Sequence, residues 1–126
     1  MISRIIDRIY IGDEADVDVR NLDRIGINTV LDLRHLNIDL DHNRESSVIG
    51  VRTSVERLET YYRKNRTILV HCHAGIDRAP FIVALWLCTH DNFTFGEAYA
   101  FVKGKRPQTI EHWEWAEALG VIHDDM

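Results

Sequence analysis

The chain has 126 residues, of which 45% are hydrophobic and 28% are charged. These proportions predict one globular domain over residues 1–126, with room for a single hydrophobic core. Lys and Arg number 15 and Asp and Glu number 20, and the net charge of −5 argues against a general affinity for nucleic acid or anionic membranes.

The first residues do not resemble a secretion signal. Arg4, Asp7 and Arg8 interrupt the apolar residues there, so no long apolar run forms. The longest apolar stretch, 79–88, is too short to cross a bilayer and predicts a buried helix instead. We therefore expect a cytoplasmic protein without a membrane span, in which both cysteines stay reduced.

The first half of the chain predicts strands that alternate with helices. Isoleucines at even spacing predict one or two short strands over 4–11, and a helix over 16–25 should end at Gly26. Residues 28–33 are β-branched and apolar enough for a buried strand. The stretch 34–52 is polar and weakly periodic, so we expect a loop or irregular structure there.

The second half predicts one more strand and several helices. In chain order they are a helix from a Thr53–Glu56 capping box to about 64, a strand over 67–70, a central helix over 79–90, a helix capped by Thr94 and Glu97 that ends near 103–104, and a last helix over 109–119. The basic run 103–106 is interpreted as charge at a helix end. The pattern predicts an α/β fold with a short, mostly parallel central sheet flanked by helices.

Segment 71–78, HCHAGIDR, joins the last predicted strand to the central helix. A tight loop of this length can aim successive backbone N–H groups inward, and the helix that follows adds the positive end of its dipole. Gly75 permits a backbone conformation that a side chain would hinder, and Arg78 can present a two-pronged guanidinium to phosphate oxygens. The same field favours a thiolate on Cys72. The segment therefore predicts a phosphate site with a nucleophile in it.

This segment matches the HC-x5-R signature of the cysteine-dependent protein tyrosine phosphatases, and the chain resembles their small dual-specificity branch. Other segments that resemble this branch are IYIG at 9–12, GINTVLDL at 26–33, ILVHC at 68–72, and the helix from 97 that ends in KRP at 105–107. Only 34–52 lacks a clear counterpart. The resemblance implies a protein tyrosine phosphatase-like fold and one catalytic domain over 1–126.

The resemblance also implies a reaction in two steps. Cys72 attacks phosphorus to form a phosphocysteine, which water then hydrolyses, while Arg78 and the loop amides stabilise the phosphate oxygens. The residues implied to bind the substrate are His73, Ala74, Gly75, Ile76, Asp77 and Arg78. His71 is expected to support the loop without touching the substrate. We predict no metal ligands and no cofactor, because Arg78 and the amides supply the positive charge.

The general acid has three candidates. The family usually has an aspartate a little over thirty residues before the nucleophile, and Asp39 and Asp41 both fit that spacing, with Asp41 slightly favoured. Asp77, directly before Arg78, is similar to the DR ending of the phosphate loop in myotubularins and Sac-type phosphoinositide phosphatases. The alternatives are solvated loop aspartates for the first two and a residue that complements the helix dipole for Asp77.

Ala79 stands where the family usually has Ser or Thr, whose hydroxyl helps the cysteine thiolate leave. Its absence predicts slow hydrolysis of the phosphocysteine. We expect a phosphatase for phosphotyrosine in proteins, with phosphoserine and phosphothreonine as further substrates. The alternatives are a phosphatase for a phosphoinositide, a phosphoglucan or an RNA 5′ end, and a slow phosphate-binding module.

The expected partner is a phosphorylated protein or a small phosphomonoester, and phosphate or sulfate could occupy the loop. The acidic net charge and the lack of a basic stripe argue against RNA and other nucleic acids. We expect a monomer.

Overall fold

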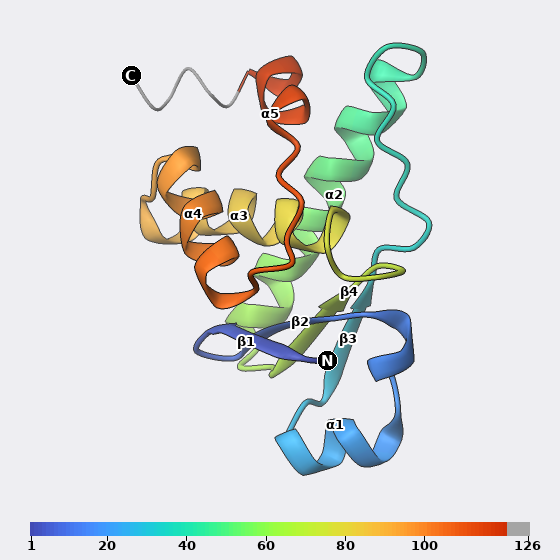
Figure 1. Ribbon diagram of the computed structural model, residues 1–126, viewed down its shortest axis with the longest axis vertical. Coiled ribbons are helices and arrows are strands. Elements are labelled where there is room, and N and C mark those ends of the chain that lie inside the picture. The colour runs from blue at the N-terminus through green and yellow to red at the C-terminus, as the bar shows by residue number, and fades with distance from the viewer. Residues whose placement is uncertain (121–126) are drawn as a thin grey trace.

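A four-stranded sheet organises the computed structural model, which describes residues 1–120 (Figure 1). Its strands are β1 (Ser3–Ile6), β2 (Ile9–Gly12), β3 (Thr29–Asp32) and β4 (Ile68–His71), and they lie in the order β1-β2-β4-β3. β1 and β2 pair antiparallel, whereas β4 runs parallel to both β2 and β3. The predicted α/β fold is therefore confirmed, with a mixed sheet in which three strands are parallel.

Helices lie on both sides of this sheet. They are η1, a short 3-10 helix (Glu14–Asp16), α1 (Val19–Ile25), α2 (Arg44–Arg63), α3 (Arg78–Asp91), α4 (Phe95–Lys105) and α5 (Trp113–Leu119). Figure 1 shows α2 to α5 gathered on one side of the sheet and α1 on the other. Within residues 1–120, no helix is long and apolar enough to cross a membrane.

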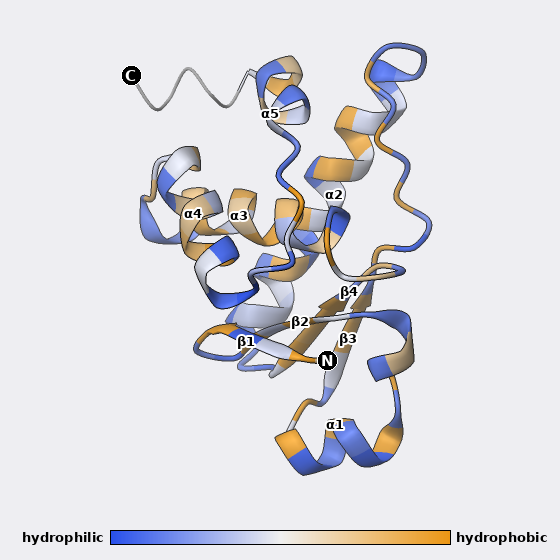
Figure 2. Cartoon of the chain, viewed as in Figure 1, coloured by the Kyte–Doolittle hydropathy of each residue, from blue (hydrophilic) through white to orange (hydrophobic). Residues whose placement is uncertain are grey.

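Helix α3 forms the centre of the core. Its residues 79–87 are all buried, because α2 and α4 pack against it. Figure 2 shows hydrophobic residues along α3 and the strands, while α1 carries both hydrophobic and hydrophilic residues. Since α3 starts where β4 and its loop end, the most buried helix of the fold holds one side of the predicted phosphate site.

Helix α2 begins at Arg44, so the predictions of a loop over 34–52 and of a helix start at Thr53 are wrong for residues 44–53. The physical reason is Ser47, whose side chain is fully buried in the first turns of α2. Its hydroxyl donates to Asn37 O at 3.3 Å and accepts from Asp39 N at 2.8 Å. A serine here interrupts the apolar period that marks a helix in sequence.

Helix α5 begins at Trp113 rather than at the predicted residue 109. The residues before it are bound elsewhere: Thr109 Oγ1 donates to Arg106 O at 2.7 Å, and Ile110 N donates to Ile76 O at 2.7 Å. The capping box of Thr94 and Glu97 is present at the start of α4, as predicted.

The Ser47 hydroxyl is expected to fix the loop after β3 onto α2. Ser47→Ala should destabilise the fold by about 1–3 kcal/mol in urea unfolding, because it leaves two backbone groups without their partner. Ser46→Ala, at an exposed position in the same turn, should stay within about 0.5 kcal/mol of the wild type. Equal effects of the two substitutions would contradict this role.

Candidate active site

Residues 72–78, which are the loop between β4 and α3 and the first residue of α3, are called the phosphate loop below. Four consecutive carbonyls of it accept hydrogen bonds from outside the loop. His73 O accepts from Glu14 N at 3.0 Å, and Ile76 O accepts from Ile110 N at 2.7 Å. The two carbonyls between them accept from Arg106: Ala74 O from Nη2 at 3.4 Å and Gly75 O from Nε at 2.7 Å. A trans peptide directs C=O and N–H oppositely, so the N–H groups of residues 74–77 point to the inner side of the loop. This arrangement is a nest of donors for an anion.

Arg106, the residue after α4, holds the loop in this conformation. The residue is only 1% exposed, and its guanidinium donates to Gly75 O and Ala74 O. It also donates to three acceptors at the N-terminus and in the first two strands. These acceptors are Met1 O, Ser3 Oγ and Ile11 O at 2.7, 2.9 and 3.2 Å. One guanidinium therefore ties the phosphate loop to β1, β2 and the N-terminus.

Burial lowers the pKa of Arg106, whereas the charges of Asp16, Asp13 and Cys72 raise it. Sequence reasoning missed this residue, since it assigned the run 103–106 to a helix end. The available signal was the Arg-Pro pair at 106–107, which is one of the segments that resemble the dual-specificity branch.

Gly75 is required at the turn of the loop, as the sequence predicted. Its φ is +68°, in the left-handed region that favours glycine. A Cβ at this position would also collide with the carbonyl of Gly12 and with Arg106 Nη2. The loop therefore packs closely against the end of β2 at this point.

Cys72 and His71 are both buried, at 0% and 3% exposure. His71 Nδ1 lies 3.3 Å from Cys72 O, and His71 Nε2 lies 3.6 Å from Asp32 Oδ1. The sheet register causes the second contact, because Asp32 and His71 are paired at the ends of β3 and β4. Hydrogen bonds from Arg34, and then the charge of His71, hold the pKa of Asp32 well below its usual range. His71 thus lies behind Cys72, between the loop and a carboxylate.

Arg78 is oriented by the loop that follows β3. Its Nη1 lies within hydrogen-bond distance of three carbonyls, those of Leu33, Arg34 and Leu36, at 3.4, 2.8 and 3.2 Å. All hydrogen bonds of this guanidinium within residues 1–120 use Nη1, and its Nε lies 3.9 Å from Asp77 Oδ1. The Nε–Nη2 edge is the one that can bind two phosphate oxygens side by side.

The aspartates at 39 and 41 lie on the loop between β3 and α2. The Asp39 carboxylate accepts from His42 N at 3.2 Å and lies 3.1 Å from His42 Nδ1, and these contacts lower its pKa. Asp41 is exposed. Neither is brought into contact with Cys72, whereas Leu36, three residues before Asp39, touches Arg78.

Asp77 is the only one of the three candidate acids in contact with Cys72 within residues 1–120. Its Oδ1 lies 3.8 Å from Cys72 Sγ and accepts from Arg78 N at 2.7 Å. His73 lies on the exposed side of the loop, where its Nδ1 is 3.1 Å from Glu14 Oε2. Ala79 is fully buried and offers no hydroxyl.

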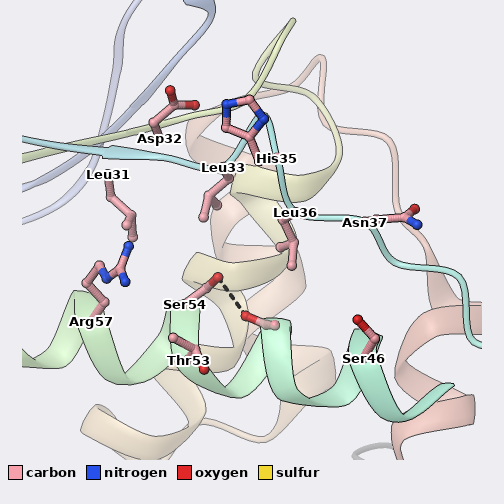
Figure 3. A pocket seen from close by; sticks show the side chains of 11 residues that line it. Leu31, Asp32, Leu33, His35, Leu36, Asn37, Ser46, Thr53, Ser54 and Arg57 are labelled. Atoms are coloured by element: carbon pink, nitrogen blue, oxygen red, sulfur yellow. Dashed lines mark hydrogen bonds between the residues drawn. The ribbon is translucent and has the colours of Figure 1, made fainter. Parts of the chain in front are cut away.

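A polar pocket of roughly 320 Å³ lies between α2 and the loop that follows β3 (Figure 3). It is lined by residues of β3, the loop after it and α2, among them Leu36 and Arg57, and it contains neither Cys72 nor Arg78. In the part of the chain that the structure describes, no three His, Cys, Asp or Glu side chains form a group that could hold a metal ion.

Curated proteins with similar sequences are phosphatases. The human dual specificity protein phosphatase 16 is 31% identical over 120 residues, which cover 83% of this chain and 18% of that protein. The tyrosine-protein phosphatase vhp-1 of Caenorhabditis elegans is 27% identical over 134 residues, which cover 94% of this chain and 20% of that protein. The chain spans about a fifth of the length of these relatives.

Solved structures share the fold. The crystal structure of human DUSP28 matches with a TM-score of 0.78 at 16% identity and covers 98% of this chain and 93% of that one. A leucine rich repeat and phosphatase domain containing protein from Entamoeba histolytica matches with a TM-score of 0.79 at 16% identity, over 98% of this chain and 91% of that one.

The family model of the dual specificity phosphatase catalytic domain matches residues 9–122. This match contains the phosphate loop, both parallel strand pairs and the buried Arg106 described above. The chain therefore belongs to the dual-specificity phosphatase family.

Proposed function

We propose that this chain is a phosphatase that hydrolyses phosphomonoesters through a phosphocysteine on Cys72. The observation that carries the proposal is the loop that begins at Cys72: its carbonyls are bound from outside, which turns four N–H groups inward, and Arg78 begins α3 at the end of the same loop. Such a preorganised set of donors stabilises the charge that develops on the equatorial oxygens of a phosphoryl group. We take residues 1–126 as one catalytic domain.

In the first step, the Cys72 thiolate forms a bond to phosphorus and the bond from phosphorus to the leaving oxygen breaks. The leaving oxygen takes a proton from the general acid. In the second step, water attacks phosphorus and gives a proton to the same carboxylate, while the S–P bond breaks and Cys72 leaves as a thiolate. Ala79 cannot assist this departure with a hydroxyl, so we expect the second step to limit turnover.

Protein phosphotyrosine is the substrate class that we propose, with phosphoserine and phosphothreonine as further substrates. The names of the relatives, a dual specificity protein phosphatase and a tyrosine-protein phosphatase, support a protein substrate. A cytoplasmic location and a monomeric state stay predictions.

Asp41 is the general acid that we favour. A general acid must hold a proton, and the hydrogen bond from His42 lowers the pKa of Asp39, which disfavours that form. The loop that carries both aspartates is held to Arg78 through Leu36 O. Asp41 lies five residues after Leu36, and an extended stretch of five residues spans about 17 Å, so a closure of this loop can bring Asp41 toward the phosphate.

The first test is stopped-flow hydrolysis of para-nitrophenyl phosphate. The wild type should release nitrophenol, and Cys72→Ser should lower the rate by roughly a thousandfold or more, because the nucleophile is lost. Cys88→Ser, at the other cysteine of the chain, is the matched control and should keep the wild-type rate. A single burst followed by a stall would indicate the slow phosphate-binding module, and no release with any variant would contradict the proposal.

The second test compares an aryl with an alkyl phosphate, because an alkoxide leaves poorly without a proton. Asp41→Asn should lower kcat/KM, which reports the first step, on the alkyl phosphate by about 100-fold and have a much smaller effect on kcat/KM for para-nitrophenyl phosphate. Asp39→Asn should leave the alkyl to aryl ratio near that of the wild type. If Asp39→Asn or Asp77→Asn alone lowers the ratio, that residue is the acid and Asp41 is not.

A further inference from the structure

The Asp77 carboxylate occupies part of the site where the proposed function requires phosphate. Its Oδ1 accepts from Arg78 N at 2.7 Å, lies 3.8 Å from Cys72 Sγ and lies 3.9 Å from Arg78 Nε. A phosphate in the loop would contact the same three groups. The protein therefore carries a negative charge of its own at the place where the substrate's charge has to bind.

Helix capping explains the position of only one oxygen of this carboxylate. Asp77 is the N-cap residue of α3, which explains the hydrogen bond that Oδ1 accepts from Arg78 N. It does not explain the direction of Oδ2, which points toward His112 and lies 3.9 Å from His112 Nε2. A like charge this close to an entering phosphate repels it, so the carboxylate has to move or be neutralised when phosphate binds.

His112 is held firmly beside Asp77. Its ring stacks on Trp115 with a centroid distance of 3.7 Å, its Nδ1 lies 2.7 Å from Glu114 Oε1, and its backbone N donates to Tyr99 Oη at 2.8 Å. Burial raises the pKa of Tyr99 to about 12, so this hydroxyl stays neutral. His112 is therefore fixed by two contacts of its ring and one hydrogen bond of its backbone.

The remaining nitrogen of His112 has no hydrogen-bond partner among residues 1–120. Nε2 is buried and is the one buried side-chain polar atom without a hydrogen bond in residues 1–120. A buried polar atom without a partner is unfavourable, and such atoms are rare in folded proteins. A shift of the Asp77 carboxylate by about 1 Å would bring Oδ2 within hydrogen-bond distance of Nε2.

We propose that Asp77 is an internal anion of the phosphate loop and that His112 is the positioning residue that receives its carboxylate when a phosphate group enters. The phosphate oxygens then accept hydrogen bonds from Arg78 N and from the Nε edge of Arg78, and Asp77 Oδ2 accepts one from His112 Nε2. His112 Nδ1–H faces Glu114 Oε1, so Nε2 can donate to Asp77 only when it also carries a proton, and this proton comes from solvent as phosphate enters. The proposal rests on the proposed function in one respect, namely that phosphate binds in this loop.

The test measures the Kd for inorganic phosphate by NMR titration, which does not depend on turnover. Asp77→Asn should lower Kd about tenfold, which corresponds to a wild-type loop that is free of the carboxylate about one tenth of the time. Asparagine keeps the helix cap, so this change removes only the charge. His112→Ala should raise Kd severalfold, and His112→Gln, which keeps a donor, should restore most of the affinity.

The decisive comparison is the double variant. If His112 acts only by receiving Asp77, His112→Ala should leave Kd unchanged in the Asp77→Asn background. His90→Ala is the matched control, because His90 also stacks on a tryptophan and also has a glutamate at its Nδ1, but lies near the far end of α3. It should leave phosphate binding unchanged. In turnover assays, the effect of His112→Ala should fall on KM more than on kcat.

Four results would overturn the inference. Weaker or unchanged phosphate binding in Asp77→Asn would exclude an internal anion, and additive effects in the double variant would give His112 a purely structural role. Phosphate binding that is absent from the wild type and from all variants would overturn the inference together with the proposed function. If Cys88→Ser keeps its turnover while the Kd for phosphate is the same in the wild type, Asp77→Asn and His112→Ala, the inference is overturned and the proposed function stands.

Discussion

The buried guanidinium of Arg106 bonds to the phosphate loop on one side and to the first two strands on the other. A buried charge is costly unless hydrogen bonds satisfy it, and this one meets five oxygen acceptors and the nearby carboxylates of Asp13 and Asp16. Because two of those acceptors are loop carbonyls, their peptides turn the following N–H groups inward. The affinity for an anion that we propose for this loop thus depends on a cation that does not face the anion.

The other parts of the site depend on the same principle, that backbone groups are fixed from outside the loop. The register of β3 and β4 places Asp32 beside His71, and His71 beside the carbonyl of Cys72. The segment before α5 donates from Ile110 to Ile76, and η1 donates from Glu14 to His73. A loop of a few residues is therefore held by contacts from Glu14 and Ile110, which lie far apart in the sequence, and these contacts preorganise the proposed anion site.

The sequence predicts the backbone of residues 72–78 well because three of these residues have separate chemical reasons. Glycine at 75 allows a left-handed backbone, arginine at 78 offers two donors on one edge, and Cys72 follows a buried strand. In the structure, the φ of Gly75 is +68° and Cys72 directly follows β4. It predicts the start of α2 poorly, because the buried residue there is Ser47 and not an apolar one. The Thr53–Glu56 pattern resembles a capping box although it lies inside a helix.

Contacts between distant segments explain what else the sequence could not reveal. Arg106 reads as surface charge in a basic run, and only the packing of α4 against β1 shows that it is buried. Likewise, His112 is separated from Asp77 by two helices, so no local pattern links them. The spacing of Asp39 and Asp41 from Cys72 suits the family, but their loop leads to the first turn of α2, and spacing alone does not decide between them.

The phosphate affinity of Arg106→Lys tests the central claim most directly. Lysine keeps the charge but offers a point charge instead of a planar fork, so it cannot bind the loop and the strands together. In a protein that still unfolds cooperatively, the account predicts a Kd for inorganic phosphate raised by about tenfold or more, with changed amide shifts at Gly75 and Ile76. Arg24→Lys, at the end of α1, should leave both unchanged. A folded Arg106→Lys protein that binds phosphate as the wild type does would contradict the account.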